Sequence, residues 1–149
     1  MTVDIAILLV EDNTDDRELA LAALRECCDP SRIIAVSDGE QALDYLLARK
    51  EHADRDARKQ PRLVVLDINL PKMSGVDVLK AMRDEPNTQG VPVVMLTGTS
   101  EKDVLDRCYE AGANSVVRKA ADFDELRRKM RQMYEFWITV NEANRNSRV

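Results

Sequence analysis

Five residues that could share one chemical site each stand at or near the end of an apolar run. Glu11 and Asp12 follow the run IAILLV, and Asp67 follows LVVL. Thr97 follows VVML, and Lys119 comes shortly after a pair of valines. Apolar runs of this length are typical of strands buried on both faces. Because an unpaired buried carboxylate is costly, we expect Asp67 to have charged partners close by.

The chemistry that these residue types suit is phosphoryl transfer assisted by a divalent cation. Three carboxylates packed closely repel one another and are poorly solvated, and a hard cation relieves both effects. Mg2+ prefers oxygen ligands, keeps several waters and is typically held by a few carboxylates beside a phosphate. A hydroxyl and an ammonium group would complete a site in which positioning and charge neutralisation do most of the catalysis.

Most members of this set also have a purely structural interpretation. Glu11 and Asp12 are compatible with a turn and a helix start, Thr97 with a simple strand end, and Lys119 with a surface position. Asp67, directly after four apolar residues, is harder to explain in this way. Four strands that each deliver a suitable group at the same end favour a functional site over coincidence.

The elements that must position these groups alternate strictly between strand and helix. Apolar runs predict strands over residues 5–10, 33–36, 63–67, 91–96 and around 116–117. Amphipathic patterns predict helices over about 13–28, 38–47, 76–83, 100–111 and 122–138. Short apolar strands alternating with helices predict a parallel sheet covered on both faces. We therefore expect an α/β fold, a flavodoxin-like (βα)5 doubly wound parallel sheet of strand order 2-1-3-4-5 with an extended C-terminal helix, whose site lies between strands 1 and 3.

Local signals refine this pattern. Ser100 is expected to cap the fourth helix, Gly112 to follow its end in a left-handed conformation, and Asp122 with Glu125 to resemble a capping box. The charged segment 49–62 is expected to be an exposed loop without a function. The residues predicted to face the core are Leu19, Ala23 and Leu24 in the first helix, Ala42, Leu43, Leu46 and Leu47 in the second, and Phe123, Leu126, Met130, Met133 and Trp137 in the last.

Composition narrows the class of protein. The chain has 149 residues, 44% of them hydrophobic and 33% charged, which fits one globular domain. A net charge of -5 argues against a nucleic-acid module. No apolar run approaches a membrane span, and no signal peptide is recognisable. Cys27, Cys28 and Cys108 are expected to be reduced packing residues of a cytoplasmic protein. His52, the only histidine, is expected in a solvated loop, and its isolation excludes a histidine metal site or a Ser-His-Asp triad.

Four segments resemble the receiver domain of two-component response regulators. They are ILLVEDNTDDREL, VVLDINLPKMSGVDVLKAMR, VPVVMLTG and AGANSVVRKA, and together they cover nearly the whole chain. The resemblance implies that a histidine kinase phosphorylates Asp67. It further implies that Glu11, Asp12, Asp67 and the backbone carbonyl of Asn69 hold Mg2+. Thr97 would hydrogen-bond the phosphoryl group, and Lys119 would pair first with Asp67 and then with the phosphate.

Two positions depart from the family's pattern. The family usually has a cis Lys-Pro bond where this chain has Lys119-Ala120, and a non-proline cis bond costs about 2.5–4 kcal/mol, so we expect trans. The family often has an aromatic readout residue where this chain has Val116. Asn69 and Thr99 occupy positions that tune the family's rate of phosphate hydrolysis. With the FW pair in MYEFWITVNEAN, these departures resemble the small regulators that partner bacterial and cyanobacterial phytochromes.

The resemblance implies a receiver domain over residues 1–140, a polar tail over 141–149 and no output domain, so that the signal passes through protein contacts. Consecutive helical residues point about 100° apart, so the large side chains near the C-terminus cannot all face one core. We therefore expect a homodimer formed by the fourth helix, the fifth strand, the last helix and the extension. Its expected contacts are Tyr134, Phe136, Trp137 and Ile138.

Other functions fit less well. A phosphatase that forms an aspartyl phosphate usually carries a second Asp two residues after its nucleophile, where this chain has Asn69. A flavin-binding module would need a Ser/Thr/Gly-rich phosphate loop after the first strand, where this chain is acidic and would repel the phosphate. A P-loop nucleotide-binding protein does not fit, because its motif GxxxxGK[ST] is absent. The expectation is a switch without substrate turnover beyond slow loss of its own phosphate. A pseudo-receiver that works without phosphorylation stays open.

Overall fold

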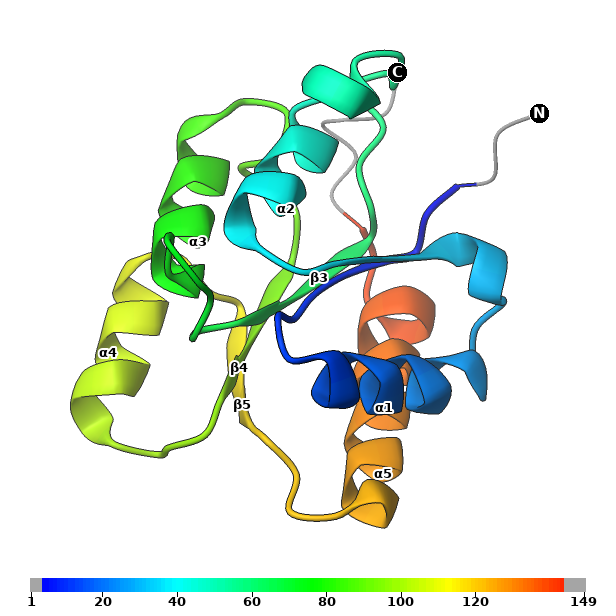
Figure 1. Cartoon of the computed structure of the whole chain (residues 1–149), viewed down its shortest axis with the longest axis vertical. Helices are drawn as coiled ribbons and strands as arrows, with labels where there is room; N and C mark the ends of the chain where they lie inside the picture. Colours follow the sequence, from blue (N-terminus) through cyan, green and yellow to red (C-terminus); the bar gives the residue numbers. More distant parts are fainter. Residues whose placement is uncertain (1–3, 144–149) are drawn as a thin grey trace.

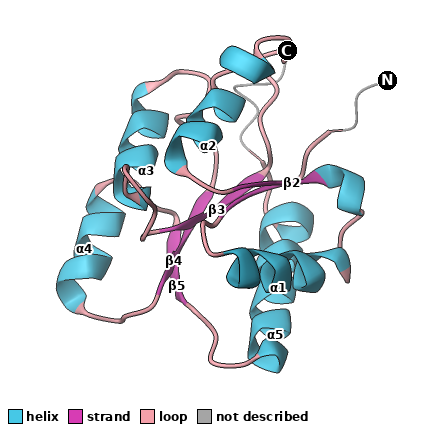
Figure 2. Cartoon of the chain, in the orientation of Figure 1, coloured by secondary structure: helices cyan, strands magenta, loops and turns pink. Residues whose placement is uncertain are grey.

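A computed structural model of the chain describes residues 4–143 and contains one five-stranded parallel sheet. The strands are β1 (Ile7–Val10), β2 (Ile33–Val36), β3 (Leu63–Asp67), β4 (Val93–Thr97) and β5 (Ser115–Arg118). Their order across the sheet, drawn in magenta in Figure 2, is β2-β1-β3-β4-β5, which confirms the flavodoxin-like prediction. β1, β3 and β4 are fully buried, as their unbroken apolar runs predicted.

Five α-helices cover the two faces of the sheet. They are α1 (Thr14–Arg25), α2 (Gly39–Leu46), α3 (Gly75–Asp84), α4 (Lys102–Glu110) and α5 (Phe123–Tyr134). Figure 1 shows α1 and α5 on one face and α2, α3 and α4 on the other. Along β1 the side chains alternate between the two cores, with Ile7 and Leu9 toward α1 and α5, and Leu8 and Val10 toward the other helices.

Several helix ends follow the predicted signals. The side chain of Asn13 accepts the N–H of Asp16 at 2.9 Å and caps α1. Asp122 accepts the N–H of Glu125 at 2.8 Å and caps α5. Gly112 follows α4 with a φ of 107°, a conformation that side chains other than glycine rarely adopt.

Three expectations about individual residues were wrong. Leu19 is 45% exposed, because Ala20, Ala23 and Leu24 define the inner face of α1 and Leu19 lies about 100° off it. Phe123 is 37% exposed, because it begins the first turn of α5 rather than lying along the core. Ser100 does not cap α4, since Glu101 is the capping position and the hydroxyl of Thr99 accepts its N–H at 3.1 Å.

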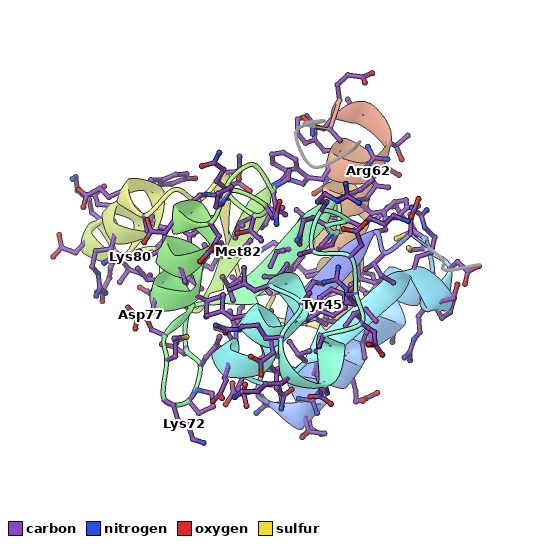
Figure 3. All side chains as sticks on the ribbon, turned by 90° about the horizontal axis from the view of Figure 1, so that it is seen from above. Tyr45, Arg62, Lys72, Asp77, Lys80 and Met82 are labelled. Atoms are coloured by element: carbon purple, nitrogen blue, oxygen red, sulfur yellow. The ribbon has the colours of Figure 1, made fainter. Side chains whose placement is uncertain are left out.

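The charged segment 49–62 is largely exposed, as expected, but part of it packs on the domain. It contains a short 3-10 helix, Lys50–His52, and the ring of His52 packs edge-on against Tyr45 with centroids 5.2 Å apart. The guanidinium of Arg55 lies 3.9 Å from the centroid of the Tyr45 ring. Figure 3 shows Tyr45 beneath this part of the chain. His52 is therefore half-buried rather than solvated.

The last helix is extended, as predicted, but its winding changes near the end. α5 stops at Tyr134 and continues as a π-helical segment, Glu135–Val140. Within it Phe136 is 48% exposed, whereas Ile138 is 7% exposed and belongs to the core. The predicted polar tail lies largely outside the described residues. Within residues 4–143, no helix combines the length and the apolar character that a membrane span requires.

Candidate functional site

The carboxyl ends of β1, β3, β4 and β5 bring the predicted site residues to one edge of the sheet. The register pairs Val10 with Leu66 and Asp67 with Leu96, so Glu11 and Asp67 emerge side by side. Thr97 pairs with Arg118, and the N–H of Lys119 donates to the Thr97 carbonyl at 2.7 Å. Parallel strands thus align the ends of apolar runs that are far apart in sequence.

Lys119 is the cation of this site. Its Nζ lies 2.6 Å from Oδ2 of Asp67 and 3.2 Å from Oε1 of Glu11, and Asp16 Oδ2 is 3.9 Å away. The side chains of Asp67 and Glu11 are only 2% and 4% exposed. Burial lowers the pKa of Lys119, but the hydrogen bonds and charges of the two carboxylates outweigh it, so the pKa is raised.

Glu11, Asp12 and Asp67 form a compact acidic cluster. Each offers a carboxylate oxygen, and these oxygens lie within 4.8 Å of one another. Burial, and then the hydrogen bond and charge of Asp67, raise the pKa of Glu11 to about 7. The backbone N–H groups of Asn13 and Asn69 donate to Glu11 Oε2 at 3.1 Å and Asp67 Oδ1 at 2.9 Å. Lys119 is the one full positive charge at this cluster of three carboxylates, and the two backbone amides are neutral donors, so the site is short of positive charge.

A hard divalent cation fits this donor set. All the side-chain donors are carboxylate oxygens, which suit Mg2+ or Mn2+. Two of the three acids are buried, whereas Asp12 is exposed, so an ion could be reached from solvent while keeping part of its water shell. Burial first, and then the hydrogen bond and charge of Asp67, disfavour the ionised form of Glu11 and raise its pKa, and a cation bound here would favour that ionised form.

The Thr97 hydroxyl is hydrogen-bonded to Thr99 and not to Asp67. It donates to the Thr99 carbonyl and accepts the Thr99 N–H, both at 3.1 Å. The side chain is 3% exposed and lies at the site edge of the sheet. The structure therefore brings Glu11, Asp12, Asp67 and Lys119 together, and holds Thr97 beside them in a local turn.

Gly75 explains how the chain turns back so closely after Asp67. Its N–H donates to the Ile68 carbonyl at 2.8 Å, and a Cβ at this position would lie 2.9 Å from the Cα of Ile68. Only glycine permits this approach of backbone to backbone. α3 then begins directly, with Ser74 and Asp77 forming a capping box. Figure 3 shows Lys72 at the tip of this loop.

Sequence reasoning missed Arg17. Its guanidinium reaches back from α1 and donates to the backbone carbonyls of Glu11 at 2.9 Å and Asp12 at 3.4 Å. It therefore fixes the loop that carries two of the three acids. One signal in the sequence could have found it. Helical side chains lean toward the N-terminus of their helix, so Arg17, one turn into α1, can reach the loop before the helix.

The two departures from the family's pattern are visible in the geometry. The Lys119–Ala120 bond is trans, as expected, because the described residues contain no cis peptide bond. Val116 is half-buried in β5, and its backbone N–H donates to the hydroxyl of Tyr109 in α4 at 3.2 Å. No signal in the sequence had pointed to Tyr109.

The fold and the acidic site together define a class of protein. The sequence profile of the response regulator receiver domain matches residues 7–131, and the chain belongs to this family. The match spans all five strands and every residue of the site described above.

Comparison with individual relatives shows which kinds of response regulator this chain resembles. The chain is 35% identical to a probable methanogenesis regulatory protein, FilR2, of Methanothrix harundinacea over 92% of this chain and 86% of the relative. It is 30% identical to response regulator Rcp1 of Synechocystis over 89% of this chain and 88% of that protein. The crystal structure of the phosphorylated cyanobacterial phytochrome response regulator RcpA superposes with a TM-score of 0.86 at 31% identity, covering 95% of this chain and 99% of that one. The predicted resemblance to phytochrome response regulators is thereby confirmed.

Proposed function

We propose that the chain is a phosphorelay switch whose receiver domain, residues 1–140, accepts a phosphoryl group from a histidine kinase on Asp67. The observation that carries the proposal is the buried Asp67 carboxylate, held 2.6 Å from Lys119 within a cluster of three acids. A purely structural acid would gain nothing from two further carboxylates, because like charges at this distance repel. A phosphoacceptor that works with a cation needs this arrangement.

In the proposed step, an Asp67 carboxylate oxygen attacks the phosphorus of a phosphohistidine. The new O–P bond forms as the P–N bond breaks, and the imidazole nitrogen leaves with the bonding pair and is protonated by solvent. Lys119, which neutralises Asp67 beforehand, stays within reach of the transferred phosphoryl oxygens. The Thr97 hydroxyl and the Asn69 N–H are donors at the same edge of the sheet.

Glu11, Asp12, Asp67 and the Asn69 carbonyl are the residues that would hold Mg2+. The bound ion would neutralise charge on the phosphoryl oxygens. One structure of a relative, Rcp1, is described as the Mn(2+)-bound form; it superposes with a TM-score of 0.83 at 28% identity, covering 94% of this chain and 99% of that one. Arg17 orients the first two ligands through their backbone carbonyls.

The site is proposed to act without turnover of any other substrate. A phosphatase of the aspartyl-phosphate type would need an acid–base carboxyl near the nucleophile, and the residue two positions on is Asn69, whose side chain transfers no proton. Asn69 and Thr99 would tune slow loss of the phosphate by water. A pseudo-receiver function is the outcome to accept if Asp67 stays unmodified.

Intact-mass analysis after incubation with acetyl phosphate and Mg2+ tests the proposal. We expect one phosphate per chain in the wild type and none in Asp67→Asn or in the presence of a chelator. Asp77→Asn, which changes an exposed acid at the start of α3, is the matched control and should be phosphorylated normally. An unmodified wild-type chain would support the pseudo-receiver function instead.

The partner is proposed to be a phytochrome-type histidine kinase in the cytoplasm. The similarity to RcpA supports this choice, whereas the similarity to FilR2 allows a kinase with another stimulus. Transfer from a purified, autophosphorylated phytochrome kinase should be faster than transfer from an unrelated kinase at equal concentration. Equal rates would remove the argument for a light sensor.

A homodimer is proposed on the α4–β5–α5 face and the C-terminal extension. Phe136 is 48% exposed and packs edge-on against Trp137 with ring centroids 4.9 Å apart. Tyr134 and Trp137 are half-buried against the core, and Ile138 is core, so Phe136 is the most available to a partner of the four expected contacts. Sedimentation of Phe136→Ala should show a lighter species than the wild type, whereas Leu19→Ala on α1 should not. An unchanged dimer mass in Phe136→Ala would place the interface elsewhere.

A further inference from the structure

A cleft of about 490 Å³ lies between α2 and the loop that joins β3 to α3. Its walls include the apolar side chains of Leu43, Pro71 and Met73, and Asp44 of α2 lines it as well. Among the described residues that line the cleft, none belongs to the acidic site. Figure 1 shows α2 and α3 next to each other on one face of the sheet. The cleft is therefore a feature separate from the site of Asp67.

Asp44 is a buried acid whose carboxylate lacks hydrogen-bond donors. Its side chain is 9% exposed, and within residues 4–143 its Oδ1 atom accepts no hydrogen bond. Nε of Arg49 lies 3.3 Å from Oδ1, and Nζ of Lys50 lies 3.9 Å from Oδ2, so both cations are within ion-pair distance without donating a hydrogen bond. Buried carboxylate oxygens without donors are costly. Asp44 therefore leaves hydrogen-bonding capacity unused on the wall of a cleft.

The cations beside Asp44 are weakly held. Lys50 is bonded to another acid, since its Nζ lies 2.6 Å from Oε1 of Glu40. The side chain of Arg49 is half exposed, and exposed ion pairs contribute little to stability. The acidic and basic side chains that line the cleft are equal in number, so no net charge opposes an entering cation. Displacing Arg49 from Asp44 should therefore cost little.

The backbone at the rim of the cleft has an uncommon conformation. Lys50 and Lys72 line the cleft with φ angles of 51° and 67°, and Ala48, two residues before Lys50, has a φ of 54°. In the part of the chain that the structure describes, these are the only residues other than glycine with a positive φ. Such conformations cost free energy and concentrate at functional sites. They support a functional interpretation of the cleft, and the Asp44 carboxylate indicates what the cleft recognises.

We propose that this cleft is a docking site for an arginine side chain of a partner protein. A guanidinium group presents its N–H donors in one plane and pairs with a carboxylate through two hydrogen bonds, so it would supply the donors that Asp44 lacks. The methylene groups of the same side chain would pack against Leu43, Pro71 and Met73. Lysine fits less well, because its ammonium group makes no such double contact. The proposed docking does not depend on phosphorylation of the chain.

An NMR titration of the full chain with N-acetyl-arginine amide, read at the amides of Leu43 and Met73, tests the proposal. We expect saturable shifts of both amides with a dissociation constant in the millimolar range, because a single side chain buries little surface. N-acetyl-citrulline amide has nearly the same shape but no charge, and should bind at least about tenfold more weakly. Free L-arginine, the probe for a free amino acid as the source, should bind no more tightly than the amide.

Two variants should change the affinity for N-acetyl-arginine amide in opposite directions. Asp44→Asn keeps the shape of the buried side chain and removes its charge, so binding should weaken at least about tenfold. Arg49→Ala removes the competing cation, so binding should tighten about threefold. Arg25→Ala, which removes an exposed arginine on α1, is the matched control and should bind as the wild type does. Asp44→Asn should still be phosphorylated by acetyl phosphate, which verifies that it is folded.

Three results would overturn the proposal. Unshifted Leu43 and Met73 amides in both the wild type and Arg49→Ala would show that the cleft takes no guanidinium group. Equal affinity in the wild type and Asp44→Asn, or for the arginine and citrulline probes, would show that the Asp44 charge is not recognised. If Asp44→Asn does not fold, the citrulline comparison decides this point. Tighter binding of free L-arginine than of the amide would assign the cleft to a free amino acid instead of a partner protein.

Discussion

Two lysine–aspartate pairs in this molecule have the same length and very different surroundings. Lys119 and Asp67 lie 2.6 Å apart at the acidic site, and Lys102 and Asp106 lie 2.6 Å apart on α4. Asp67 is 2% exposed and Asp106 is 47% exposed, and the two lysines are 31% and 85% exposed in the same order. The difference teaches that distance alone does not make an ion pair important, because water screens the second pair more than the first.

The same contrast separates the two regions as a whole. The carboxyl ends of β1 and β3 hold buried charge in a fixed geometry, with backbone donors on both Glu11 and Asp67. The α4–β5 edge holds its contacts near solvent and is anchored by little buried surface. A switch needs both kinds of region, one rigid enough to position chemistry and one loose enough to respond.

Replacing each lysine in turn should give the largest difference in stability between the two ion pairs. Lys119→Met leaves Asp67 and Glu11 buried without their cation, and we expect the free energy of unfolding in metal-free buffer to fall by about 3 kcal/mol. Lys102→Met should cost less than about 0.5 kcal/mol. Urea unfolding of both variants measures the difference. Equal losses would mean that the site tolerates buried charge without Lys119.

The second effect in size is the pH dependence of stability that the buried Glu11 of the acidic site should cause. Because the pKa of Glu11 is raised from 4.5 to about 7 in the folded chain, its contribution is fully present below pH 4.5 and lost as the pH rises toward 7. Between these pH values Glu11 should lower the free energy of unfolding by at most about 3 kcal/mol. Urea titrations of the metal-free wild type and of Glu11→Gln isolate this contribution. A slope that is unchanged in Glu11→Gln would contradict the raised pKa of Glu11.

The smallest of the three effects concerns the loop that carries two of the acids. Arg17→Ala removes the donors to the Glu11 and Asp12 carbonyls, and we expect Mg2+ affinity to weaken about tenfold. Arg25→Ala, an exposed arginine in the last turn of the same helix, is the matched control and should bind Mg2+ normally. Calorimetric titration measures both affinities. Wild-type affinity in Arg17→Ala would show that the loop holds its shape without this side chain.

The strand ends could be predicted from the sequence because two simple signals coincide there. An unbroken apolar run identifies a buried strand, and the polar residue that ends it must lie at the rim of the sheet. This reasoning applied to Asp67 and Thr97, whose strands end at those residues. Alternation of strand and helix then placed the ends together through the topology.

Contacts made by helix side chains could not be predicted in the same way. Leu19 and Phe123 are apolar residues at helical spacing, and a small error in helix phase or in the position of the first turn moves such residues to the surface. Tyr109 and Arg17 depend on reaching backbone groups of other elements, which no sequence period encodes. The sequence therefore predicts the strand ends, which follow from backbone periodicity, and not the contacts of individual helix side chains.

Borohydride reduction of the phosphorylated chain tests the central claim most directly. Borohydride converts an aspartyl phosphate to homoserine, and peptide sequencing by mass spectrometry then locates the modified residue. After incubation with acetyl phosphate and Mg2+, we predict homoserine at position 67, with Asp12 and Glu11 unchanged. Homoserine at position 12, or an intact Asp67 in a chain whose mass shows one phosphate, would contradict the assignment of Asp67 as the phosphoacceptor.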